Sequence, residues 1–338
     1  MNLRSVFLAP GAAAAVVAGA LGVATTALAA DKLVQIDGSS TVYPITEAVA
    51  EEFQKAQRGA VNVTVGISGT GGGFKKFCRG DTDIADASRP ILKEEMTECA
   101  KNGIKYVELP IAFDALTVAV SKQNTWVDHL TVAELKKMWA PEAQGKVTNW
   151  KQIRDSFPDA PLQLAGAGAD SGTFDYFTEA IVGKAKSQRG DYQATEDDNV
   201  TIQFVSRSKN ALGYFGLAYF VENQDKLKAV PIKVDEKAAA VLPSVATVNS
   251  GKYQPLSRPI FIYVKEASLA RPEVKDFVVF YLEHGAELAK EVGYVDLPAK
   301  AYELALTNLN KKKLGTAFGG VPEVGVKVEE LLAREAKL

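Results

Sequence analysis

The chain has 338 residues, with 39 basic and 41 acidic side chains and a formal net charge of −2 at pH 7. Nucleic-acid binding calls for a strongly basic face, so this near balance argues against a nucleic-acid partner. A chain of this length exceeds what one hydrophobic core usually serves, and two domains are therefore expected.

The N-terminal segment has the pattern of a secretory signal. Arg4 is followed by an uncharged run over residues 6–30 that is rich in Ala, Val and Leu, and the triplet Ala-Leu-Ala at 27–29 fits the small-x-small cleavage rule. We expect cleavage near Ala29 or Ala30 and a periplasmic mature protein; the alternative is an uncleaved membrane anchor. No later segment approaches the ~20 apolar residues of a membrane helix.

Short strands alternate with helices along the mature chain, which is the pattern of an α/β protein. Val34 and Ile36 mark a first strand, and strict alternation of apolar residues predicts a second strand over residues 61–67. Helical spacing of apolar residues over 45–56, with Pro44 in the first turn, predicts the helix between them.

Small polar residues follow both strands, at the carboxyl ends where ligands bind in open α/β sheets. Ser40 and Thr41 lie where the first helix starts, and their hydroxyls can either cap that helix or bind a ligand. Thr70 and Gly71 open the next helix, in a glycine-rich turn that lets the backbone approach an anion or is merely flexible.

A short strand over residues 84–87 leads to Ser88 and Arg89. The guanidinium fork of Arg89 matches two oxygens of a tetrahedral anion. A surface salt bridge is the alternative role for this side chain.

The only cysteines are Cys78 and Cys99. In an exported chain an even pair predicts one disulfide, which would close a loop of about 20 residues and stabilise the fold by roughly 3 kcal/mol. Two separate buried thiols are the alternative. His129 and His284 lie far apart and near no cysteine, so we expect no metal site and no other cofactor.

Two extended apolar segments, residues 106–120 and 259–264, are interpreted as crossings between two lobes. They divide the mature chain into a discontinuous first lobe, 31–112 plus 262–338, and a second lobe, 113–261. Two lobes joined by two strands form a hinge, with a ligand site in the cleft between them.

A third polar loop joins a predicted strand at 162–164 to a helix that starts near Gly172. Ser171 and Thr173 place two hydroxyls beside backbone N–H groups at the positive end of that helix. Glycines beside hydroxyls at three strand–helix junctions indicate an oxyanion site that needs no metal.

Four motifs occur in order along the chain: DGSSTVYP at 37–44, SGTGGG at 68–73, ASRPI at 87–91 and DSGTF at 170–174. Together they resemble the periplasmic phosphate-binding proteins of ABC-type uptake systems (the PstS-like family), and most closely the cyanobacterial-type branch. The resemblance implies a type II periplasmic binding fold, α/β in class, with a mixed sheet flanked by helices in each lobe and two hinge strands. It also implies a monomer that is not an enzyme, and membrane permease subunits as partners.

The resemblance further implies that inorganic phosphate is held by hydroxyls and backbone amides. The residues that it assigns are Ser40, Thr41, Thr70, Gly71, Ser171, Gly172 and Thr173. Ser88 and Arg89 complete the set of candidate phosphate ligands, on the chemistry of their own side chains.

Two positions depart from the enteric pattern of this family. Ala167 stands where that pattern has an arginine, and Ser88 stands where it has the aspartate that accepts the proton of phosphate. We expect Arg89 to restore the positive charge. The proton acceptor stays open between Ser88, Asp86 and Asp170. A carboxylate acceptor favours phosphate, which keeps a proton at neutral pH, over sulfate, which does not.

Three classes of function compete. A binding module would capture phosphate, close around it and present it to a permease. A sensor of the same fold, or a binding protein for another tetrahedral oxyanion, would use the same loops. A phosphatase or serine hydrolase would need an activated nucleophile, and the sequence has neither a Gly-x-Ser-x-Gly elbow nor clustered histidines. The binding module is the preferred interpretation.

Overall fold

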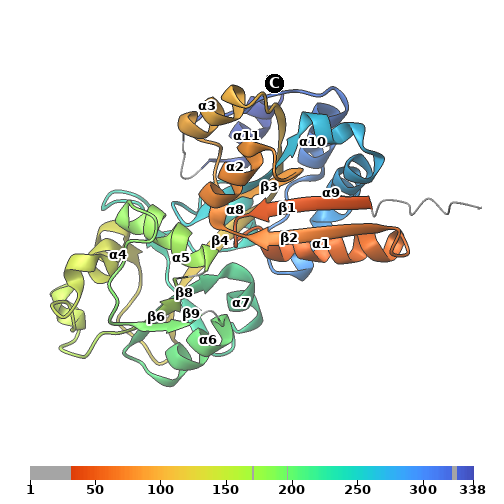
Figure 1. The fold of residues 1–338 in the computed structure, drawn as a ribbon. Helices are drawn as coiled ribbons and strands as arrows, with labels where there is room; N and C mark the ends of the chain where they lie inside the picture. The colour runs from red at the N-terminus through yellow and green to blue at the C-terminus, as the bar shows by residue number, and fades with distance from the viewer. Residues whose placement is uncertain (1–31, 170, 196, 322–325) are drawn as a thin grey trace, which may run out of the picture. The chain divides into compact units, whose positions relative to one another are not determined.

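The computed structural model describes residues 32–169, 171–195, 197–321 and 326–338 (Figure 1). The predicted signal segment and Asp170 therefore lie outside the described residues. Within the described ranges, no helix is both long enough and apolar enough to cross a membrane.

Strands from the whole described chain join in one mixed sheet, in the order β2-β1-β3-β11-β4-β8-β6-β7, with β9 also paired to β4. A separate two-stranded sheet pairs β5 with β10. The strands are β1 (Lys32–Gly38), β2 (Val61–Ile67), β3 (Ile84–Ala87), β4 (Tyr106–Ser121), β5 (Leu130–Thr131), β6 (Gln163–Ala167), β7 (Gln193–Thr195), β8 (Ala211–Gly216), β9 (Leu227–Ala229), β10 (Ile232–Lys233) and β11 (Ser257–Lys265).

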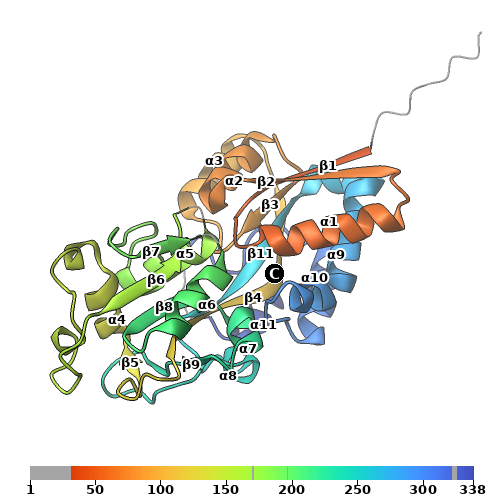
Figure 2. The same ribbon diagram turned by 90° about the horizontal axis from the view of Figure 1, so that it is seen from below.

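The two segments interpreted as crossings are the long strands β4 and β11. They run antiparallel as direct neighbours (Figure 2). β4 is buried along its whole length, because its first part pairs with β11 and its later part with β8 and β9. One strand thus belongs to both halves of the sheet. The division into lobes 31–112 plus 262–338 and 113–261 stays a prediction.

Helices cover the sheet and connect its strands. The predicted first helix forms as α1, with Pro44 in its first turn and Ile45, Val49 and Phe53 buried. The helices are α1 (Tyr43–Ala56), α2 (Gly69–Arg79), α3 (Lys93–Lys101), α4 (Val132–Trp139), α5 (Gly172–Phe177), α6 (Asp198–Arg207), α7 (Leu217–Glu222), α8 (Val245–Asn249), α9 (Pro272–Glu291), α10 (Ala299–Asn310) and α11 (Val328–Glu335). The α/β class predicted from the sequence is confirmed.

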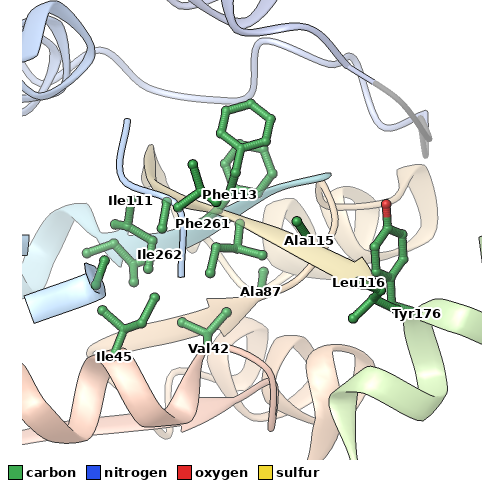
Figure 3. Packing of buried hydrophobic residues seen from close by; sticks show 14 of the residues in the cluster. Val42, Ile45, Ala87, Ile111, Phe113, Ala115, Leu116, Tyr176, Phe261 and Ile262 are labelled. Atoms are coloured by element: carbon green, nitrogen blue, oxygen red, sulfur yellow. The ribbon is translucent and has the colours of Figure 1, made fainter. Parts of the chain in front are cut away.

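The hydrophobic core continues beneath the carboxyl ends of the strands. In Figure 3, Val42 and Ile45 lie below Ala87, and Tyr176 lies beside Leu116. Val42 and Ile45 belong to the α1 region, whereas Tyr176 belongs to α5. Because a single cluster contains all of these side chains, the loops that lead into α1 and α5 adjoin the same hydrophobic core.

Helix α2 begins at Gly69, so Thr70 and Gly71 lie in its first turn, as expected from the sequence. Gly73 explains how this helix fits the sheet. A β-carbon at Gly73 would lie 2.5 Å from the α-carbon of Gly38, at the end of β1. Real β-carbons do not approach so closely, so only glycine lets α2 pack here.

The predicted disulfide is confirmed. Cys78 on α2 is bonded to Cys99 on α3, and both residues are buried. The bond ties together the two helices that carry Thr70 and Glu95.

Candidate functional site

A cavity of about 400 Å³ lies where the predicted loops converge. Its walls come from the loop after β1, the first turn of α2, the loop after β3, helices α3 and α5, the segment after α5, and strand β11. Of the predicted ligands, the walls contain Ser40, Thr70, Gly71, Ser88, Arg89 and Gly172.

Ser40 and Thr41 do not cap α1. The residue at the N-cap is Val42, and no side chain caps that end of the helix. The backbone N–H of Thr41 instead donates to the hydroxyl of Ser39, at 3.2 Å. Of the two roles considered for Ser40 and Thr41, capping is therefore excluded.

Thr70 and Ser88 form a pair of hydroxyls on the wall. Their oxygens lie 3.0 Å apart, and the backbone N–H of Ser88 donates to Thr70 Oγ1 at 3.1 Å. Ser68 also lies on the wall, and its hydroxyl donates to the carboxylate of Asp37, which Lys76 Nζ contacts at 2.6 Å. The turn that begins α2 is thus fixed by polar contacts to neighbouring strands.

Arg89 lies on the wall, but its guanidinium already has a partner. Nη1 and Nη2 donate to the two carboxylate oxygens of Glu95 at 2.9 and 2.8 Å, and Nη1 also donates to the carbonyl of Pro90. Glu95 accepts a further bond from the backbone N–H of Leu92. The side chain therefore faces the pocket as one member of an ion pair, and its role as a ligand stays a prediction.

The third predicted loop begins α5 as expected. The hydroxyl of Ser171 accepts from the backbone N–H of Thr173 at 3.1 Å, so Ser171 is the N-cap. Gly172 lies directly against Thr41 of the first loop. Thr41, Ser171 and Thr173 border the cavity rather than line it.

Arg258 on β11 is a pocket residue that the sequence analysis did not single out. Arg258 is 5% exposed, and its guanidinium lies 3.8 Å from the centre of the Tyr176 ring. Nε lies 3.5 Å from Oδ2 of Asp114, its cross-strand partner on β4. Asp114 inside one extended apolar segment and Arg258 directly before the other were the signal that could have revealed this pair.

Residues 18–284 match a family described as the PBP superfamily domain. This chain belongs to that superfamily. Protein SphX of Synechococcus elongatus is 53% identical over 95% of this chain and 94% of its own length. The phosphate-binding protein PstS of Staphylococcus haemolyticus is 40% identical over 81% of this chain and 84% of its own length. The crystal structure of a possible phosphate-binding protein from Planctomyces limnophilus is 51% identical, covers 83% of this chain and 98% of its own, and has a TM-score of 0.76. The family resemblance drawn from the four motifs is confirmed.

Among the described residues, three carboxylates lie on the pocket wall of this PBP-superfamily protein: Glu95, Asp175 and Glu179. Glu95 pairs with Arg89, and Glu179 lies 4.0 Å from Arg258. Burial raises the pKa of Asp175 above its ordinary value, although the nearby ammonium of Lys186, at 3.7 Å, opposes that shift. A half-buried carboxylate beside an anion pocket can accept a hydrogen bond from a protonated anion.

Asp86, one candidate proton acceptor from the sequence, is not on the pocket wall. Its side chain on β3 is 1% exposed, and burial raises its pKa to about 7. Asp170, the other carboxylate candidate, lies outside the described residues, and Ser88, the third candidate, lies on the wall. Among the residues that the structure describes, no cluster of three or more His, Cys, Asp or Glu side chains is placed to hold a metal ion.

Proposed function

We propose that this PBP-superfamily protein captures inorganic phosphate in the 400 Å³ pocket and delivers it to an ABC-type permease. One observation carries the proposal: short polar segments after β1, β3 and β6 and before α2, far apart in sequence, supply walls of the same cavity. Hydroxyls and backbone amides at helix starts can hold a tetrahedral anion without a metal. The relatives named as phosphate-binding proteins support the choice of ligand.

Binding and closure would be coupled in this proposal. The cavity has Ser40, Thr70 and Ser88 from the predicted first lobe and Gly172 from the second. An anion that contacts both sets stabilises the arrangement in which they are close, because it binds that arrangement more tightly than an open one. A permease would then recognise the closed form.

Calorimetric titration of the mature chain, residues 31–338, tests the ligand. We expect saturable 1:1 binding of phosphate at pH 7 and much weaker binding of sulfate. Absence of binding heat or of a thermal shift with phosphate would overturn the proposal, whereas equal binding of sulfate or arsenate would favour the broader oxyanion alternative. Steady hydrolysis of p-nitrophenyl phosphate would favour the enzyme.

The role in uptake and the location are tested in cells. Deleting the gene from its host and restoring it should respectively abolish and restore high-affinity phosphate uptake. A chain that binds phosphate yet leaves uptake unchanged is a sensor instead. N-terminal sequencing of the periplasmic fraction should find a mature end beginning near Ala30, as the proposed export signal requires.

A further inference from the structure

We propose that Arg258 binds the phosphate directly and is the guanidinium that this chain uses in place of the arginine missing at Ala167. The inference rests on the proposed function and names a ligand residue that none of the four motifs contains. Arg258 reaches the same pocket from β11, at the centre of the sheet.

The burial of Arg258 requires an explanation. A charged side chain that is 5% exposed is costly unless other groups compensate its charge. Asp114 compensates one edge only, through Nε at 3.5 Å, while the flat face of the guanidinium rests on the Tyr176 ring. These contacts hold the plane of the guanidinium, and Arg258 lines the cavity.

The terminal nitrogens are weakly engaged in the structure. Nη2 donates to Thr41 Oγ1 at 3.3 Å and to the carbonyl of Gly172 at 3.5 Å, both long contacts. Nη1 lies 4.0 Å from Glu179, beyond hydrogen-bond distance. Arg89 differs, because both of its terminal nitrogens are bound to Glu95. Of these two arginines, Arg258 therefore has the greater capacity to bind two oxygens of an anion.

The position of Arg258 also explains how one residue could couple phosphate binding to the closure of the two predicted lobes. Thr41 precedes α1, Gly172 begins α5, and the guanidinium contacts both. A phosphate bound to Arg258 would thus be held next to the first and third loops at once. Asp114 acts as a positioning residue, since it fixes the guanidinium from the neighbouring strand.

Calorimetry of Arg258→Met and Arg258→Lys with phosphate tests the assignment. We expect Arg258→Met to weaken binding by about a hundredfold, because a charge-assisted, two-pronged contact is lost. Arg258→Lys keeps a point charge without the fork, and we expect a loss of about tenfold.

Arg189→Met is the matched control. Arg189 is 4% exposed and bound to Asp191 and to main-chain carbonyls away from the pocket, so its loss should lower Tm and leave Kd unchanged.

A direct measurement separates binding from folding. The ¹⁵Nε–Hε resonance of Arg258 is assigned in NMR spectra as the one that is absent from Arg258→Lys. In the wild-type protein, phosphate should shift this resonance. If Arg258→Met does not fold, this resonance and the Kd of Arg258→Lys decide the question. An unmoved resonance, or a Kd for either variant within threefold of wild type, would overturn the assignment while wild-type phosphate binding kept the proposed function intact. A wild-type protein that binds no phosphate would instead overturn both.

Discussion

Gly172 lies against Thr41 so closely that no β-carbon fits between them. A β-carbon built on Gly172 would overlap the Thr41 hydroxyl and lie 2.5 Å from the Thr41 backbone nitrogen. The two residues belong to loops that end different strands, and both loops border the pocket. Their contact therefore sets the distance between the first and third loops.

Gly172→Ala should separate these two loops. The added methyl group would meet the backbone of Thr41 as well as its side chain. A change of the Thr41 rotamer therefore cannot make room for it, and the loops themselves must shift. We expect phosphate affinity to fall by more than about tenfold, because a binding site tolerates only displacements well below 1 Å in the groups that contact its ligand. Calorimetry checks this. Gly190→Ala is the control, because its β-carbon would lie at an ordinary 3.5 Å from Gln144 and Gly190 does not line the pocket. Equal affinities of the two variants would contradict the expectation.

Arg89→Ala tests the cation that the sequence favoured. We expect at least tenfold weaker phosphate binding, both because a positive charge leaves the wall and because Glu95 then faces the anion without its partner. The double variant Arg89→Ala/Glu95→Gln separates the two causes. If the double variant regains wild-type affinity, Arg89 acts only by neutralising Glu95. An unchanged Kd in the single variant rules Arg89 out as a ligand.

The sequence predicted the parts of this site that have a local signature. The pattern is a hydroxyl or a glycine between the end of a strand and the start of a helix, as at Ser40, Thr70 and Gly172. It can be recognised from neighbouring residues in the sequence alone. Strict alternation likewise predicted β2 with the bounds Val61–Ile67 that the structure has. The order of the strands, by contrast, depends on pairings between distant segments.

Arg258 shows why the remaining site residues escaped prediction. Its partner Asp114 and its contacts Thr41 and Gly172 come from three other parts of the chain. The antiparallel pairing of β4 and β11 brings Asp114 to Arg258, and tertiary packing brings Thr41 and Gly172. Arg89 shows the converse. Its position was predicted and a salt bridge was one of the two roles considered for it, but the sequence did not identify Glu95 as the partner, because that contact depends on where α3 packs.

Asp175→Asn should reduce the preference for phosphate over sulfate. Oδ1 of Asp175 is buried and has no hydrogen-bond partner among the described residues, and the side chain lies on the pocket wall. Phosphate can donate its remaining proton to this carboxylate, whereas sulfate has none and meets repulsion. We expect the ratio of the two Kd values at pH 7 to fall by about tenfold or more. Asp81→Asn, at an exposed ion pair with Arg79, serves as the control. If Asp175→Asn leaves the ratio of the two Kd values unchanged, Asp175 is not the proton acceptor, and Asp170 and Ser88 are the candidates for it.

Removing the disulfide should destabilise the walls that α2 and α3 carry. Cys78 and Cys99 are separated by 21 positions, and a loop of that length is worth roughly 3 kcal/mol in the unfolded chain. We expect Cys78→Ala/Cys99→Ala to lower the free energy of unfolding in urea by about that amount. Dithiothreitol should reproduce the loss in the wild type and leave the double variant unchanged. A wild type indifferent to reduction would contradict this expectation.

Asp86→Asn should change how stability depends on pH. Burial raises the pKa of this carboxyl from 3.8 to about 7, so the folded state retains a proton that the unfolded state has released between these values. The folded state binds more protons in this window, and the free energy of unfolding therefore falls as pH rises from about 4 to 7. The full shift corresponds to on the order of 4 kcal/mol.

An asparagine at position 86 carries no titrating proton, so the stability of Asp86→Asn relative to wild type should increase steadily from pH 4 to 7 and then level off. Urea unfolding of both proteins at pH 4, 5.5, 7 and 8 measures this difference. Parallel curves would show that the carboxyl does not titrate in this range. The same variant tests the sequence-based role of Asp86 as proton acceptor: because the side chain lies off the pocket wall, we expect its phosphate-to-sulfate ratio to match that of the wild type.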